Sequence, residues 1–134
     1  DCRPIRAGNA WIIDYLVAIK PEIVVVDGAN GQAVLAEEMK DARLKAPELP
    51  TVKQVITANT LFEQALSAAS ITHMNQPSLT QSVSNCKKRA IGTNGGFGYQ
   101  SMKEEIEIAL LDSVILAHWK CAMSKEKKKQ KARY

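Results

Sequence analysis

Residues Glu22 to Gly28 read Glu-Ile-Val-Val-Val-Asp-Gly, and this apolar run ending in an acid decides how the rest of the chain is interpreted. Four β-branched residues in succession are typical of a strand buried on both faces, as in a parallel or mixed sheet. Pro21, directly before the run, ends the preceding helix. The run stops at Asp27, and α/β proteins place ligands and chemistry at the carboxyl end of such a strand.

Asp27 has two interpretations at this stage. Gly28 beside it carries no side chain, so a metal ion or a phosphate could approach the backbone closely. Alternatively, Asp27 only opens the Asp-Gly turn or caps the next helix. The stretch alone leaves both interpretations open.

The composition bounds the class of protein. The 134 residues predict one α/β domain over 1–123 and a Lys-rich tail over 124–134. The net charge of +4 permits an anionic partner. The three cysteines form no CxxC pair, so neither a zinc ribbon nor a disulfide framework is indicated, and reduced thiols in a cytoplasm are the simplest account. No apolar stretch reaches transmembrane length, so we predict no membrane partner.

Periodicity and capping residues predict alternating elements. Thr51 can cap a long helix, and Ser101 with Glu104 forms a capping box for the last one. A turn cluster at 92–98 lacks the residues of a phosphate loop and predicts a loop or hairpin. We expect helices over 8–20, 32–44, 51–69, 75–89 and 101–123, and strands over 22–27 and 71–74.

A second acid, Asp112, lies inside the last predicted helix, in a nearly continuous apolar run from Ile106 to Ala117. Burying an ionised carboxylate alone costs on the order of several kcal/mol, and no Lys or Arg lies within one turn. A metal ion, or water at the sheet edge, is the expected partner. If Asp27 and Asp112 converge across the sheet, they could hold Mg²⁺ or Mn²⁺ ions that activate water and stabilise the leaving oxygen of a phosphodiester. Carboxylates suit these hard cations.

The basic residues Lys87, Lys88 and Arg89 lie at the end of the predicted helix 75–89. Cations at that end complement the helix dipole. The alternative is that they contact phosphates of DNA. Lys103 is a further candidate for a DNA contact.

Three stretches resemble the nuclease domain of the large subunit of tailed-phage terminase, over about residues 8–123. They are Val24 to Gly28, Asn75 to Leu79 with Lys88 and Arg89 beyond, and Glu107 to Trp119. The resemblance implies an RNase H-like mixed sheet flanked by helices. It also implies metal-dependent cutting of concatemeric double-stranded DNA during genome packaging. Asp27 matches the family's acid on the strand after the first helix, and Asp112 matches its acid in the last helix.

The resemblance further implies partners and a setting: the terminase ATPase domain, the small terminase subunit and the portal protein, in the cytoplasm of a bacterial host that carries a phage or prophage. The family's first acid lies on a strand upstream of the helix at 8–20, and no such strand precedes Gly8. Some relatives carry a histidine where this chain has Ala109. We therefore expect a domain that lacks its first strands and hydrolyses DNA slowly or not detectably. The alternatives are a non-catalytic α/β interaction module and another RNase H-like enzyme, such as an integrase or resolvase.

Overall fold

The structure, a computed structural model, describes residues 3–28 and 31–131 and divides the chain into two compact units. The first unit is Asp1–Pro50 and the second is Thr51–Tyr134. The α/β class is confirmed, with five α-helices and one two-stranded antiparallel sheet in the described ranges. None of the helices in those ranges is long and apolar enough to cross a membrane.

The first unit contains a 3₁₀ turn, η1 (Ile5–Ala7), and two helices, α1 (Ala10–Ile19) and α2 (Gln32–Asp41). Its core joins Leu16 of α1 to Leu35 and Met39 of α2. The two helices were expected at nearly these positions.

The strand expected over 22–27 is wrong in extent. Only one parallel bridge forms there, between Val25 and Glu48. Val26 N donates to Glu48 O at 3.0 Å, and Glu48 N donates to Val24 O at 2.8 Å. The next bond of a parallel ladder would need the N–H of residue 50, and Pro50 has none. The pairing therefore stops after one residue.

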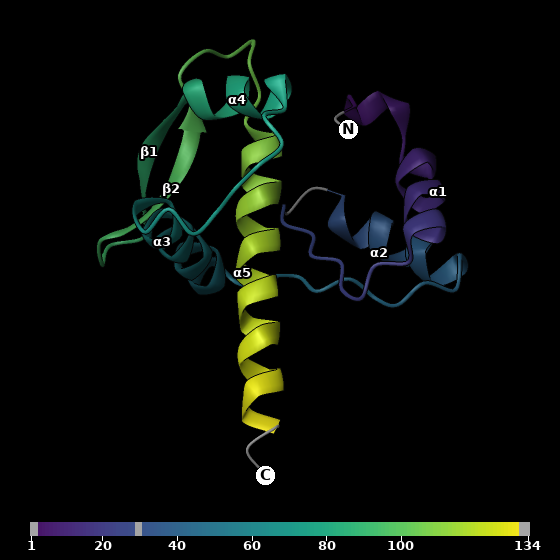
Figure 1. Ribbon diagram of the computed structural model, residues 1–134. Coiled ribbons are helices and arrows are strands. Elements are labelled where there is room, and N and C mark those ends of the chain that lie inside the picture. Colours follow the sequence, from purple (N-terminus) through teal and green to yellow (C-terminus); the bar gives the residue numbers. More distant parts are fainter. Residues whose placement is uncertain (1–2, 29–30, 132–134) are drawn as a thin grey trace. The chain divides into compact units, whose positions relative to one another are not determined.

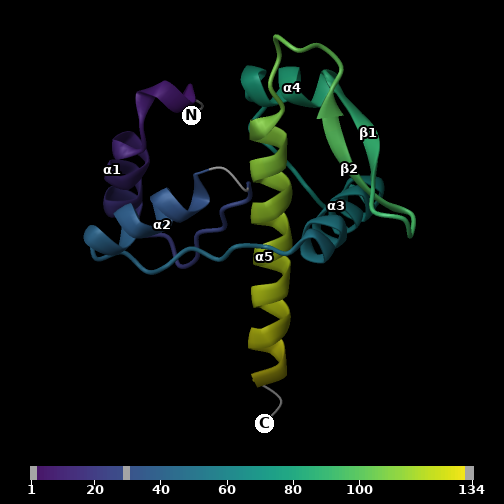
Figure 2. The same cartoon turned by 180° about the vertical axis from the view of Figure 1, so that it is seen from behind.

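The second unit contains α3 (Val52–Ser67), α4 (Pro77–Ser84), strands β1 (Cys86–Ile91) and β2 (Gly96–Ser101), and α5 (Ala109–Lys131). α3 and α4 pack on the N-terminal half of α5, and the hairpin packs on α3 (Figure 1, and from behind in Figure 2). The buried apolar side chains of this unit come from α3, α5 and the segment before α5: Ala58, Phe62, Ala65, Ile108, Leu111, Ile115, Leu116 and Trp119.

Local signals placed α3 correctly. Thr51 caps it, and Gln54 completes a capping box, in which Gln54 N donates to Thr51 Oγ1 at 3.2 Å and Thr51 N donates to Gln54 Oε1 at 2.8 Å. This pair satisfies two backbone N–H groups that a helix start leaves without partners.

Three other expectations are corrected. The helix expected over 75–89 ends at Ser84, because residues 86–91 pair with β2 in a hairpin. The turn cluster closes that hairpin, with Gly92 and Gly95 at positive φ, as the hairpin interpretation predicted. No strand forms over 71–74. The last helix begins at Ala109 rather than Ser101 and continues through Lys131, well into the predicted tail.

Candidate functional site

Asp27 lies in the first unit, directly after the bridge at Val25, and its side chain is exposed. Its Oδ1 accepts a hydrogen bond of 2.9 Å from the backbone N–H of Gly28. This bond agrees with the interpretation that Asp27 opens the Asp-Gly turn. The same bond orients the carboxylate and still leaves its exposed oxygens accessible to a ligand.

Asp112 lies in the first turn of α5 and is exposed, so of the two partners expected for it, a metal ion or water, its position already provides water. The helix turns its neighbours Leu111 and Ile115 into the core and leaves Asp112 on the outer side. An acid at this position is stabilised by the helix dipole. Its location therefore requires no buried cation.

The start of the hairpin has one thiol, that of Cys86, whose pKa is shifted. Burial raises the pKa of the Cys86 thiol, and the negative charges of Asp112 and Glu63 raise it further. Cys86 is the first residue of β1. Asn85, directly before β1, donates to the backbone O of Ile106 at 3.1 Å, so the start of α5 lies beside the start of the strand that carries Lys87, Lys88 and Arg89.

Those three basic residues do not lie at a helix end, so the dipole interpretation is wrong for them. They are exposed on β1, where alternate side chains point to opposite faces of the strand. Lys88 therefore points away from the face of Lys87 and Arg89. Arg89 Nε donates to the backbone O of Tyr99 at 3.3 Å. Lys103 is exposed in the bend after β2.

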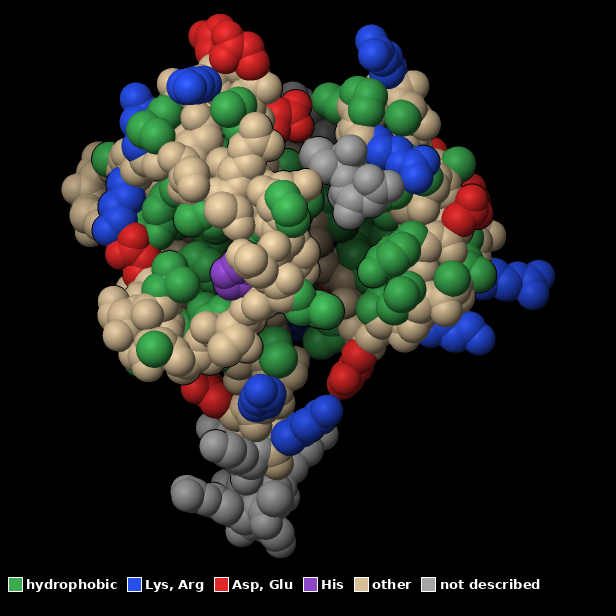
Figure 3. All heavy atoms as spheres, turned by 45° about the horizontal axis from the view of Figure 1, so that its top comes forward, with side chains coloured by type: hydrophobic (Ala, Val, Ile, Leu, Met, Phe, Trp, Pro, Cys, Tyr) green, Lys and Arg blue, Asp and Glu red, His purple; other side chains and the backbone are tan. Residues whose placement is uncertain are grey.

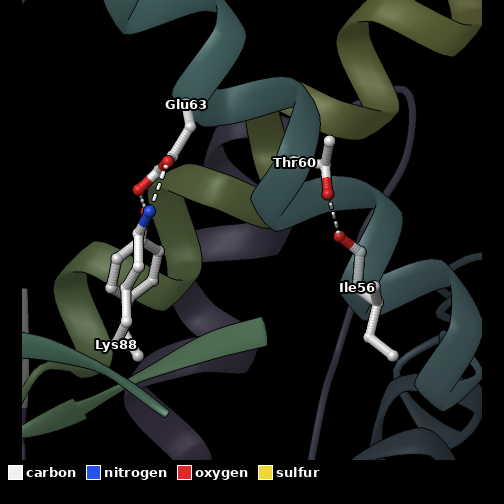
Figure 4. A network of polar contacts seen from close by, with 5 residues as sticks. Ile56, Thr60, Glu63 and Lys88 are labelled. Atoms are coloured by element: carbon white, nitrogen blue, oxygen red, sulfur yellow. Dashed lines mark hydrogen bonds and ion pairs between the residues drawn. The ribbon is translucent and has the colours of Figure 1, made fainter. Parts of the chain in front are cut away.

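Lys88 is part of a polar network that joins the hairpin to α3. Its Nζ lies 2.7 Å from Glu63 Oε2 (Figure 4) and 4.6 Å from the centroid of the Phe97 ring. Tyr99 donates its hydroxyl to Glu63 Oε1 at 2.6 Å. The hydrogen bonds from Lys88 and then Tyr99 lower the pKa of Glu63. Burial, followed by the Glu63 carboxylate, raises the pKa of Tyr99.

The two predicted metal ligands fit Mg²⁺ or Mn²⁺ in their chemistry, because both present exposed carboxylate oxygens. Asp27 belongs to the first unit and Asp112 to the second, so their predicted pairing stays a prediction. Within residues 3–28 and 31–131, no group of three or more His, Cys, Asp or Glu side chains forms a metal cluster.

Sequence reasoning missed two buried polar residues, Ser82 and Asn85. Within the helix, the apolar Val83 is 47% exposed, whereas the polar Ser82 is buried. A three-residue spacing does place Ser82 and Asn85 on one helix face. Nothing in the sequence marks that face as the buried one, since its partner is a loop.

Comparison with known proteins adds no family to this picture. No family model matches the chain. No curated protein and no solved structure gives a significant match either. The function is therefore proposed from the sequence resemblance and from the chain's own residues, above all Asp112 and the basic residues of β1.

Proposed function

We propose that the chain is the nuclease domain of a tailed-phage terminase large subunit, with an RNase H-like fold, and that it cuts concatemeric double-stranded DNA. One relationship supports this most: Asn85, the residue before β1, donates a hydrogen bond of 3.1 Å to the backbone O of Ile106, so the start of α5, with the exposed Asp112 in its first turn, lies beside the start of the strand that bears Lys87 and Arg89. Phosphodiester hydrolysis needs a carboxylate that can hold a divalent cation, and it benefits from cations that contact the neighbouring phosphates.

In this proposal, acidic residues bind the metal ion and basic residues contact the DNA. Asp27 and Asp112 hold the metal, and the N–H of Gly28 keeps the Asp27 carboxylate oriented. When bound, Mg²⁺ or Mn²⁺ supplies Lewis-acid catalysis and lowers the pKa of the attacking water. Lys87 and Arg89 position the DNA by its phosphates, with Lys103 as an outer contact. Lys88 contributes by holding the hairpin on α3.

The biological setting is proposed from the resemblance. The domain would act with a terminase ATPase domain, a small terminase subunit and a portal protein in the cytoplasm of the bacterial host. No segment of residues 3–28 or 31–131 supplies a third acid to a cluster with Asp27 or Asp112. Hydrolysis by this chain is therefore expected to be slow, and metal binding is the better first measurement.

The test is Mn²⁺ titration followed by thermal unfolding and by calorimetry. Mn²⁺ should raise the melting temperature of the wild type, because a ligand that binds only the native state stabilises it by about 2.7 kcal/mol at a hundred times its Kd. Asp27→Asn and Asp112→Asn should each remove this increment. Asp41→Asn, at an exposed acid that ends α2, is the matched control and should keep it. An increment that survives in Asp112→Asn would refute the assignment.

A second candidate is a non-catalytic module that docks on a partner. The observation in its favour is an open, mostly apolar cavity of about 470 Å³ in the second unit. Its lining includes Phe62, Leu66, Leu79, Val83, Leu111 and Val114. Hydrophobic side chains also reach the surface of the molecule in several places on the face drawn in Figure 3. Under this alternative, Mn²⁺ leaves the melting temperature of the wild type unchanged.

A further inference from the structure

Two buried polar side chains at the end of α4 take no part in the chemistry proposed above. Ser82 is 3% exposed and Asn85 is 5% exposed. Side chains with this much polarity are seldom buried so deeply unless they form hydrogen bonds that the fold needs. What these two residues bind therefore indicates what they are for.

Both residues bind the segment that leads into α5. Asn85 Nδ2 donates to the backbone O of Ile106 at 3.1 Å and to Ser101 Oγ at 2.6 Å. Its own backbone O accepts from the N–H of Met102 at 2.8 Å. Ser82 Oγ has one proton, which it shares between Ser78 O at 3.2 Å in its own helix and the backbone O of Glu107 at 3.3 Å. Residues 101–107 are thus fixed to α4 at both ends.

This attachment sets where α5 begins. The helix starts at Ala109, two residues beyond Glu107, and its first turn includes Asp112, whose N–H donates to Ile108 O at 3.1 Å. Residues 102–108 form no helix or strand of their own. Their course is therefore decided by these side-chain hydrogen bonds and by the burial of Ile108.

We propose that Ser82 and Asn85 are positioning residues that hold the start of α5, and thereby the Asp112 carboxylate, in the place where it binds a divalent cation. This role rests on the proposed function. Neither residue touches the metal or the DNA. They act through the backbone, in the way that outer-shell partners orient ligands and tune the affinity of a metal site.

The test compares two asparagines that are equally buried. Asn85→Ala removes both side-chain bonds to the 101–107 segment and keeps the backbone bond from Met102. Asn59→Ala is the matched control, because Asn59 is 4% exposed and donates to Val55 O within its own helix. Calorimetric titration with Mn²⁺, well below both melting temperatures, should show about tenfold weaker binding for Asn85→Ala and wild-type binding for Asn59→Ala. Amide exchange in the first turn of α5 should be faster only in Asn85→Ala.

Two milder substitutions, both at Ser82, test the same role in case Asn85→Ala does not fold. Ser82→Ala should weaken Mn²⁺ binding, but less than Asn85→Ala does. Ser82→Thr keeps the hydroxyl and should bind Mn²⁺ as the wild type does. If Asp112→Asn abolishes binding while Asn85→Ala binds as tightly as Asn59→Ala, the positioning role is overturned and the proposed function stands. If Asp112→Asn binds Mn²⁺ like the wild type, the proposed function falls and the role assigned to Ser82 and Asn85 falls with it.

Discussion

Glu63 on α3 and Lys88 on β1 lie 2.7 Å apart, Oε2 to Nζ, although 25 residues separate them in the sequence. Their side chains are 34% and 55% exposed, so solvent screens the pair and limits its worth to about 1 kcal/mol. The pair matters for its position, because it fastens the basic strand to a helix. Because the ammonium group of Lys88 is engaged in this ion pair, Lys87 and Arg89 are the better candidates for phosphate contacts.

Glu63→Gln should lower the free energy of unfolding by about 1 kcal/mol at neutral pH, since Gln loses the ion pair and keeps an acceptor for Tyr99. The pKa of Glu63 is lowered in the folded state, first by Lys88. Its stabilisation is therefore complete above the ordinary carboxyl pKa and is lost as the pH falls through the lowered value. Urea unfolding across this acid range should show a flatter pH dependence for the variant.

The control for that measurement is Glu37→Gln. Glu37 pairs with Lys40 at 3.1 Å on α2, but the two side chains are 65% and 73% exposed. A pair so open to solvent contributes little. Equal losses in Glu37→Gln and Glu63→Gln would mean that the Glu63 network has no special role.

Tyr99→Phe should lower the free energy of unfolding by about 1 kcal/mol, because it removes the hydroxyl that donates to Glu63. The pKa of Tyr99 is raised, first by burial and then by Glu63. Its contribution is therefore complete below the ordinary tyrosine pKa and is lost as the pH rises through the raised value. Absorbance titration of tyrosinate should show one late-ionising group in the wild type that is missing in Tyr99→Phe. A wild type whose tyrosines all ionise at the ordinary pKa would contradict the hydrogen bond.

Two glycines of β2 should tolerate alanine unequally. A Cβ at Gly98 would lie 2.6 Å from Ile91 Cδ1, the flexible end of a side chain. A Cβ at Gly96 would lie 2.7 Å from Ile56 Cδ1 and 2.9 Å from the backbone O of Ile91, which cannot rotate away. Overpacking lowers the free energy of unfolding by about 1–3 kcal/mol. Urea unfolding should show a loss near the upper end of this range for Gly96→Ala and near the lower end for Gly98→Ala.

A second substitution checks the cause of the Gly98 effect. Ile91→Val removes the Cδ1 atom that the new methyl would meet, so the double variant should recover part of the loss. A double-mutant cycle measures this coupling. Strictly additive effects would show that the clash does not explain the loss.

DNA binding should separate the basic residues of β1 by role. Each phosphate contact contributes about 0.9 to the slope of log affinity against log salt. Lys87→Gln and Arg89→Gln should each lower this slope by about that amount, whereas Lys88→Gln should mainly lower the melting temperature. Lys40→Gln, at an exposed lysine of α2, is the control and should change neither. Unchanged slopes in all four variants would exclude β1 as a DNA contact.

Several features of the fold follow from short-range signals. Thr51 and Gln54 are three residues apart, so the start of α3 is decided by two side chains and the backbone beside them. Gly92 and Gly95 allow the positive φ values that close the hairpin. The last predicted helix, 101–123, likewise coincides with α5 from residue 109 onward. In each case the interacting atoms are neighbours in the sequence, so the sequence by itself determined the outcome.

Tertiary structure decided the rest, because the deciding partner lies far along the chain. The apolar run before Asp27 forms a single bridge, since the ladder meets Pro50, which has no N–H to donate. Residues 86–91 form a strand because 96–101 pair with them, against a helical pattern that continued to Arg89. Asp112 is exposed because Leu111 and Ile115, on another face of the same helix, pack into the core with α3. A strand pairing or a buried hydrogen bond depends on which groups meet in space, and residue spacing alone does not contain that information.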